Sequence, residues 1–170
     1  MYFTLDVEAS SLEPDSFPFA VGWCDDRGVS HQLLISPPLH WNLGSWDEQA
    51  EKFHGFELYK LLSVGESVSV VANALNSELS GKTVLSDGLA FDADWVGMIF
   101  EAAGFRQDFR LLDIYQWLGG TAKEHSIPYS DLVRRITEYE DSNERRHLAE
   151  EDALFLHRMI EYALDGVRRE

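Results

Sequence analysis

Basic residues are scarce in this chain. Lysine and arginine number 14 against 30 aspartates and glutamates, so the formal net charge is −16. A protein that binds a polyanion broadly and nonspecifically normally presents a basic surface, and this composition argues against that class. Any contact with nucleic acid should therefore be local, at a short strand end.

Cysteine and long apolar runs are scarce as well. The single cysteine, Cys24, excludes an internal disulfide and fits a reducing compartment. No positively charged leader precedes an apolar stretch, and no apolar run is long enough to cross a bilayer. We therefore predict a cytoplasmic protein with no membrane partner.

The chain does contain enough apolar material for one core. Hydrophobic residues make up 45% of 170 residues, without repeats, low-complexity segments or linkers, so we expect one domain, residues 1–170. Strands are predicted at Met1–Glu8, Pro18–Cys24, Val29–Ile35, Thr83–Ser86 and Phe109–Ile114. Helices are predicted at Glu57–Leu62, Ser67–Leu79, Phe91–Ala103, Tyr115–Leu118 (ended by Gly119 and Gly120), Pro128–Tyr139 and Leu148–Leu164. A three-strand antiparallel meander followed by alternating helices and strands predicts a mixed sheet with helices packed on it.

The first strand ends in two acids on one face. Side chains alternate along a strand, so Asp6 and Glu8 point the same way and Val7 points to the other face. Two like charges side by side on a mostly apolar strand repel each other, and burying them is costly. Divalent cations between them would remove the repulsion. The pair therefore predicts half of a two-metal nuclease site.

Two later helices each carry an acid on an apolar face. Asp152 falls on the stripe of the last helix, three residues after Ala149 and four before Leu156. Asp92 lies three residues before Trp95, on the inner face of its helix. The alternative for Asp92 is a helix N-cap, and the alternative for Asp152 is a partly exposed acid at the edge of the stripe.

One histidine precedes the last of these acids. His147 lies five residues before Asp152, which is about 500° of helical rotation, so the two cannot share a helix face. If they act together, His147 must lie on the loop or first turn before the last helix, and the polar stretch Asn143–Arg146 predicts such a loop. A lone histidine is more often a surface residue, so the ordered set carries the argument. Four carboxylates can hold two hard cations about 4 Å apart, and oxygen ligands suit magnesium or manganese.

At these residues the chain resembles the DnaQ-like 3′–5′ exonucleases of the DEDDh group. The matching motifs are Leu5–Glu8, Asp87–Asp92 and His147–Ala153, in the order that the family shows. The chain departs from the family at Ala9–Leu12, where Thr and Gly often follow the first motif, and at Gly88, where Asn often stands.

The resemblance implies an α/β, RNase H-like fold: a five-stranded mixed sheet, with strands one to three antiparallel, flanked by helices. Asp6, Glu8, Asp92 and Asp152 would bind two divalent metal ions, Mg²⁺ or Mn²⁺, and His147 would act as general base on the attacking water. The substrate would be the 3′ end of single-stranded RNA or DNA, with RNA favoured because short stand-alone members often process RNA. Several relatives of this type are dimers, which leaves a homodimer open.

Neighbours of the acids are predicted to contact the substrate. The backbone near Val7, together with Ser10 and Leu12, would hold the terminal nucleotide, with Leu12 wedged against the last base. His54 and Phe91 are further candidates.

Two other functions stay open. An acidic protein of the same fold could bind a basic partner without catalysis, which the charge favours and a complete metal-ligand set disfavours. A metal-dependent phosphodiesterase acting on very short oligonucleotides would suit an acidic surface better than long strands do.

Overall fold

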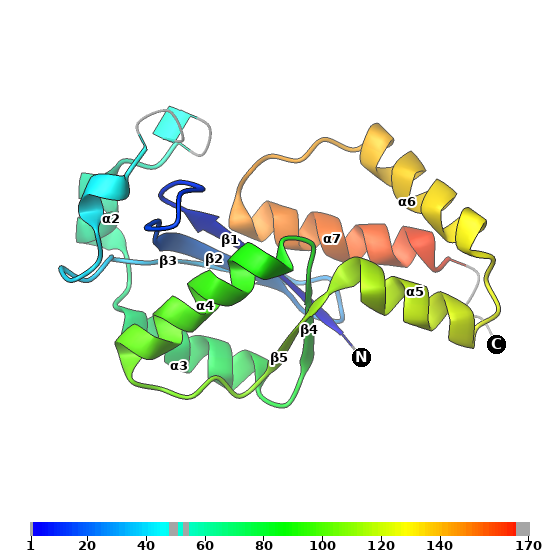
Figure 1. Ribbon diagram of the computed structural model, residues 1–170, viewed down its shortest axis with the longest axis horizontal. Helices are drawn as coiled ribbons and strands as arrows, with labels where there is room; N and C mark the ends of the chain where they lie inside the picture. The colour runs from blue at the N-terminus through cyan, green and yellow to red at the C-terminus, as the bar shows by residue number, and fades with distance from the viewer. Residues whose placement is uncertain (1, 48–50, 53–54, 166–170) are drawn as a thin grey trace.

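The computed structural model describes residues 2–47, 51–52 and 55–165, and its centre is a five-stranded sheet (Figure 1). Its strands are β1 Phe3–Ala9, β2 Pro18–Cys24, β3 Ser30–Leu34, β4 Thr83–Ser86 and β5 Arg110–Asp113. Their order is β3-β2-β1-β4-β5, with β1–β2 and β2–β3 antiparallel and with β4 parallel to β1 and β5. The predicted mixed sheet with three antiparallel first strands is confirmed.

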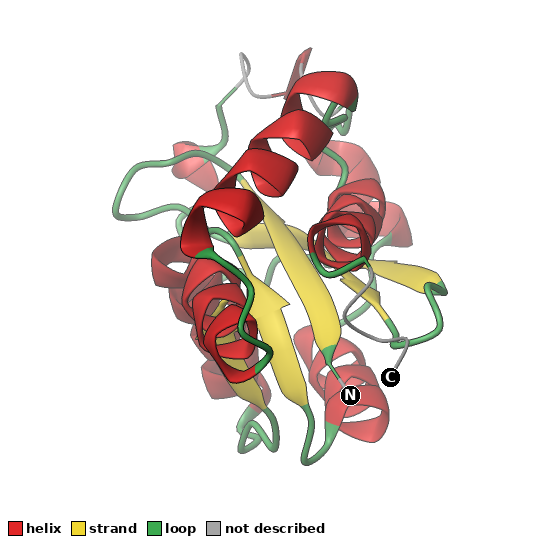
Figure 2. Ribbon diagram, turned by 90° about the vertical axis from the view of Figure 1, so that its right-hand side faces the viewer, coloured by secondary structure: helices red, strands yellow, loops and turns green. Residues whose placement is uncertain are grey.

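Helices pack on both faces of this sheet (Figure 2). They are the 3₁₀ turn η1 Leu43–Ser45 and the helices α2 Leu58–Val64, α3 Val68–Leu79, α4 Leu89–Ala103, α5 Ile114–Glu124, α6 Tyr129–Ser142 and α7 Ala149–Ala163. One buried cluster joins α3 and α4 to the sheet, and a second joins α5, α6 and α7 to its other face. None of the described helices combines the length and apolar character that a membrane span needs.

Alternation along β1 assigns its side chains to these two faces. Phe3, Leu5 and Val7 lie in the cluster with α3 and α4, whereas Tyr2 lies in the cluster with α5, α6 and α7. Because strand side chains alternate, Asp6 and Glu8 share the face that α7 covers.

Gly22 in β2 lets α7 come into backbone contact with the sheet. A Cβ atom at this position would lie 2.1 Å from the carbonyl carbon of Ala149. Gly22 is the ladder partner of Asp6, and the Thr4 hydroxyl of β1 donates to the carbonyl oxygen of Ala153 at 2.6 Å. The first turn of α7 is therefore held against β1 and β2 at the level of Asp6.

The predicted end of the Tyr115–Leu118 helix at Gly119 and Gly120 is wrong. Helix α5 continues through Gly119 and Gly120 to Glu124. A glycine in a helix interior costs about 1 kcal/mol relative to alanine. Burial of Ile114, Leu118 and Ala122, spaced four residues apart, against α6 and α7 outweighs that cost.

We expect Gly22→Ala to lower the free energy of unfolding by about 1–3 kcal/mol or more, because the added methyl group overlaps the backbone of α7. Urea unfolding followed by circular dichroism measures the change. Gly97→Ala in α4 is the matched control, because a Cβ added there has no neighbour within 4 Å. Its free energy of unfolding should rise by about 0.5–1 kcal/mol, since alanine favours a helix interior over glycine. Equal stability of Gly22→Ala and the unsubstituted protein would refute the close contact.

Candidate active site

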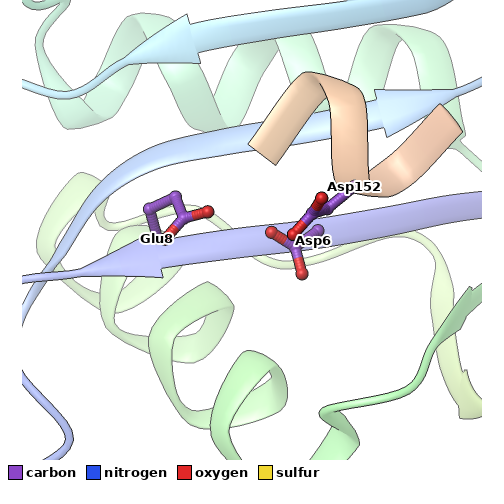
Figure 3. A group of neighbouring side chains, drawn as sticks. All are labelled: Asp6, Glu8 and Asp152. Carbon is purple, nitrogen blue, oxygen red and sulfur yellow. The ribbon is translucent and has the colours of Figure 1, made fainter. Parts of the chain in front are cut away.

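Three of the predicted carboxylates meet on the α7 face of the sheet. Asp6 and Glu8 come from β1, and Asp152 comes from the first turn of α7, which the Gly22 contact holds above the strand. Each offers a ligand oxygen, and these oxygens all lie within 4.8 Å of one another. In Figure 3 the Asp152 carboxylate points from its helix toward Asp6 on the strand.

Asp92 lies beside this group. It is in the first turn of α4 and is buried, whereas the cap position belongs to Gly88, so the N-cap alternative is wrong. The Ser86 hydroxyl at the end of β4 donates to the Asp92 carboxylate, which also accepts from the backbone of Val7. These bonds tie the start of α4 to β1 next to Asp6.

The pKa values of the four acids report a crowded and dehydrated cluster. Burial, followed by repulsion from Asp92, Glu8 and Asp152, holds the pKa of Asp6 well above its ordinary value. Burial and the neighbouring acids raise the pKa of Glu8 to about 7, and burial raises that of Asp92 to about 7. The pKa of Asp152 is also raised, mainly by burial, although Arg145 opposes the change.

The residues present fit divalent cations. Their donors are carboxylate oxygens, which suit Mg²⁺ or Mn²⁺. Positive charge at the cluster would remove the repulsion that raises the pKa values, and three of the acids have oxygens within 4.8 Å of one another. The assignment of all four as ligands stays a prediction.

His147 lies on the loop that joins α6 to α7, as its spacing from Asp152 required. It is exposed, lines the same cleft as Asp6, Glu8 and Asp92, and has a φ of 54°, which is rare for a residue other than glycine. Its role as a base stays a prediction.

Asp6, Glu8 and Asp92 line a cleft of about 570 Å³, whereas Asp152 is not part of its lining. Of the predicted substrate contacts, Val7, Leu12 and Phe91 line this cleft. Ser10 does not: it is buried, and its hydroxyl accepts from the amide of Phe17. His54 lies outside the described residues.

The cleft is also lined by residues that were not predicted as metal ligands, catalytic groups or substrate contacts. They are Ala9, Ser11, Asp47, Asp87, Gly88, Trp95 and Arg145. The sequence indicated Arg145 only as part of a polar loop and Asp87 only as the first residue of the second motif. No local pattern indicates that these two form an ion pair.

Solved structures of nucleases share this fold. The zinc-bound form of E. coli exonuclease I with single-stranded DNA aligns with 96% of this chain at a TM-score of 0.68 and 15% identity. E. coli exonuclease I with a dT13 oligonucleotide aligns with 96% at 0.68 and 14%. The nuclease domain of 3′hExo, a DEDDh family member bound to rAMP, aligns with 97% at 0.64 and 12%. No protein-family model and no curated protein sequence matches the chain.

The mixed sheet and its flanking helices form an RNase H-like fold, as predicted. More particularly, the chain has the fold of the DEDDh 3′–5′ exonucleases, as the resemblance in its motifs implied. It spans 92% of the 3′hExo domain but only 40% of the exonuclease I chain in the zinc-bound complex.

The raised pKa of Glu8 predicts how stability depends on pH without metal. The pKa of this carboxyl is about 7 in the folded protein and near its ordinary value of 4.5 in the unfolded chain, so its favourable contribution is present below pH 4.5 and is lost as the pH rises through 7. Above pH 7, Glu8→Gln should therefore melt at a higher temperature than the unsubstituted protein. The difference should be about 2–4 °C for each kcal/mol of repulsion that the substitution removes. The advantage should shrink toward pH 4.

Thermal unfolding in a chelator-containing buffer measures this difference. Glu13→Gln, which changes an exposed acid of the following loop, serves as the control and should leave the melting temperature unchanged at each pH. Added Mn²⁺ should stabilise the unsubstituted protein more than Glu8→Gln. A pH-independent difference would contradict the burial and repulsion inferred for Glu8.

Proposed function

We propose that this chain is a metal-dependent 3′–5′ exonuclease acting on single-stranded nucleic acid. The observation that carries the proposal is the convergence of Asp6, Glu8 and Asp152 within 4.8 Å, in the fold of the DEDDh exonucleases. Buried acids that repel one another destabilise a folded protein unless cations join them. A noncatalytic acidic binding protein has no use for such a cluster, so metal-dependent hydrolysis accounts for it better.

Asp6, Glu8, Asp92 and Asp152 would hold two divalent ions, Mg²⁺ or Mn²⁺. Bound ions of this kind supply a more acidic water and positive charge beside the leaving 3′ oxygen. The bonds from Ser86 and from the Val7 backbone fix Asp92 before any ligand enters. Asp92 is thus held in place at the start of α4.

His147 would take the proton from the attacking water, because the pKa of an imidazole lies near neutral pH. Leu12 and Phe91 would position the last nucleotide from the other walls of the cleft. Leu12 is 77% exposed, which suits a wedge against the terminal base. Phe91 stacks on Trp95 with ring centroids 5.6 Å apart and keeps about half of its surface free for a base.

RNA is the proposed substrate and DNA the alternative. Among the structures with this fold, 3′hExo is bound to rAMP and exonuclease I to single-stranded DNA, so the neighbours support a nucleotide cleft without separating the two sugars. We also propose that residues 1–170 act as one domain. The cytoplasmic location and the homodimer stay predictions.

The nuclease proposal is tested with 5′-labelled single-stranded RNA and DNA and added Mn²⁺. A ladder that shortens from the 3′ end is expected. Asp6→Ala should lower kcat/KM by about 10³-fold or more because it removes a metal ligand. His147→Ala should lower kcat by about 10²- to 10⁴-fold because it removes the base.

Asp141→Ala removes an exposed acid of α6 outside the cleft and should retain full activity. Calorimetry with Mn²⁺ should show binding that Asp152→Ala abolishes. Absence of cleavage of either oligomer with every divalent metal, despite intact folding, would refute the enzyme proposal and favour a binding protein.

The charge of the cleft favours short substrates as a second candidate. Among the described residues that line the cleft, acids outnumber the single arginine, Arg145. The acids are Asp6, Glu8, Asp47, Asp87 and Asp92. The whole chain carries −16. Upstream phosphates of a long strand would therefore meet repulsion rather than a basic track. A phosphodiesterase of very short oligonucleotides avoids that repulsion.

Chain length and salt distinguish the two substrate classes. If short substrates are preferred, kcat/KM for a dinucleotide should exceed that for an oligomer of about 20 nucleotides, and salt should raise the rate for the oligomer by screening repulsion. Steady-state kinetics between about 50 and 200 mM NaCl measure both effects. A long-oligomer rate that is higher and falls with salt would contradict this candidate.

A further inference from the structure

Arg145 joins two loops that border the cleft. It lies two residues before His147 on the α6–α7 loop, and its guanidinium donates to the carboxylate of Asp87, which follows β4 and precedes α4. Both side chains line the cleft and are shielded, with exposed fractions of 30% for Arg145 and 17% for Asp87. A shielded, hydrogen-bonded pair is screened less than a surface pair, so breaking it has a larger effect.

A second contact fixes the guanidinium from the side of α7. Its central carbon lies 5.0 Å from the centre of the Phe155 ring, one turn after Asp152. Phe155 in turn packs edge-on against Tyr139 of α6, with ring centroids 5.1 Å apart. Arg145 is therefore held between the helix that carries Asp152 and the loop that leads to Asp92.

The backbone after Arg145 needs such support. His147 has a φ of 54°, a conformation that costs free energy for a residue with a Cβ atom. The amide of Arg146 donates to the Asp152 carboxylate at 3.3 Å, which ties one side of the loop to α7. The contact between Arg145 and Asp87 ties the loop to the segment between β4 and α4.

We propose that the Arg145–Asp87 ion pair is a clasp that positions His147 in the cleft, which makes Arg145 a positioning residue of the nuclease reaction. This inference rests on the proposed function. The clasp sets where the α6–α7 loop lies relative to the start of α4, and so relative to the acids. The competing role for Arg145 is a direct contact with a substrate phosphate, because the side chain also lines the cleft.

The test compares Arg145→Ala in two backgrounds. With His147 present, Arg145→Ala should lower kcat by about 10- to 100-fold with KM within about twofold, because a displaced base slows the reaction without weakening binding. The Kd for Mn²⁺ should not increase, because the positive charge of Arg145 opposes rather than assists a cation beside Asp152. In a His147→Ala background the same substitution should have less than about a twofold further effect. If Arg145→Ala lowered kcat equally with and without His147, or raised KM while kcat stayed unchanged, the clasp would be overturned in favour of phosphate binding by Arg145.

The matched control is Arg146→Ala. Arg146 is the next residue of the loop and carries the same charge, but its side chain is 70% exposed and pairs with Glu151. It should retain kcat. Asp87→Asn should reproduce the Arg145→Ala loss, and combining Arg145→Asp with Asp87→Arg should recover at least about tenfold over Arg145→Asp alone. Equal losses for Arg145→Ala and Arg146→Ala would overturn the proposal, since charge alone would then explain them.

Nuclear magnetic resonance separates failure of the clasp from failure of the nuclease proposal. The chain has six histidines, and the imidazole resonance missing in His147→Ala identifies that of His147. In folded protein this resonance should move toward its unfolded position in Arg145→Ala and stay in place in Arg146→Ala. An unmoved resonance in Arg145→Ala would overturn the clasp whether or not the protein cleaves nucleic acid.

Discussion

The backbone contact between α7 and β2 is the constraint on which the candidate site depends. Gly22 stands opposite Asp6 in the ladder, and the Ala149 backbone occupies the space that a larger residue would need. The Thr4 hydroxyl bonds to Ala153 across the same contact. Asp152 lies between these two fixed points of α7, so its carboxylate lies close to β1, the strand that carries Asp6 and Glu8.

That contact also creates an electrostatic cost which the rest of the fold must offset. Burial and like charge raise the pKa values of Asp6, Glu8 and Asp92. Two apolar clusters, one on each face of the sheet, hold β1 in place despite this repulsion. Concentrated repulsion beside an open cleft is typical of functional sites, where a ligand with opposite charge supplies the missing partner.

Polar contacts to loops complete the cleft around that cluster. Ser86 holds Asp92 at the start of α4, and Asp152 accepts the amide of Arg146 at the start of α7. The Arg145–Asp87 pair links the two loops directly. The rigid elements thus place the carboxylates, while side-chain bonds between loops determine where the exposed His147 lies beside them.

Periodicity in the sequence by itself determined much of this arrangement. Alternation along β1 assigned Asp6 and Glu8 to one face, and the spacing from Ala149 placed Asp152 on a buried stripe, because a strand and a helix each orient side chains by local geometry. The placement of His147 before α7 followed from the same geometry.

Only the tertiary structure decided the rest, because it depends on contacts between residues far apart in the chain. Helix α5 continues past Gly119 since Leu118 packs on other helices, which no local propensity records. Asp87 meets Arg145 across 58 residues. The short distance between Asp152 and the β1 acids exists because Gly22 lacks a side chain at the point where α7 crosses the sheet.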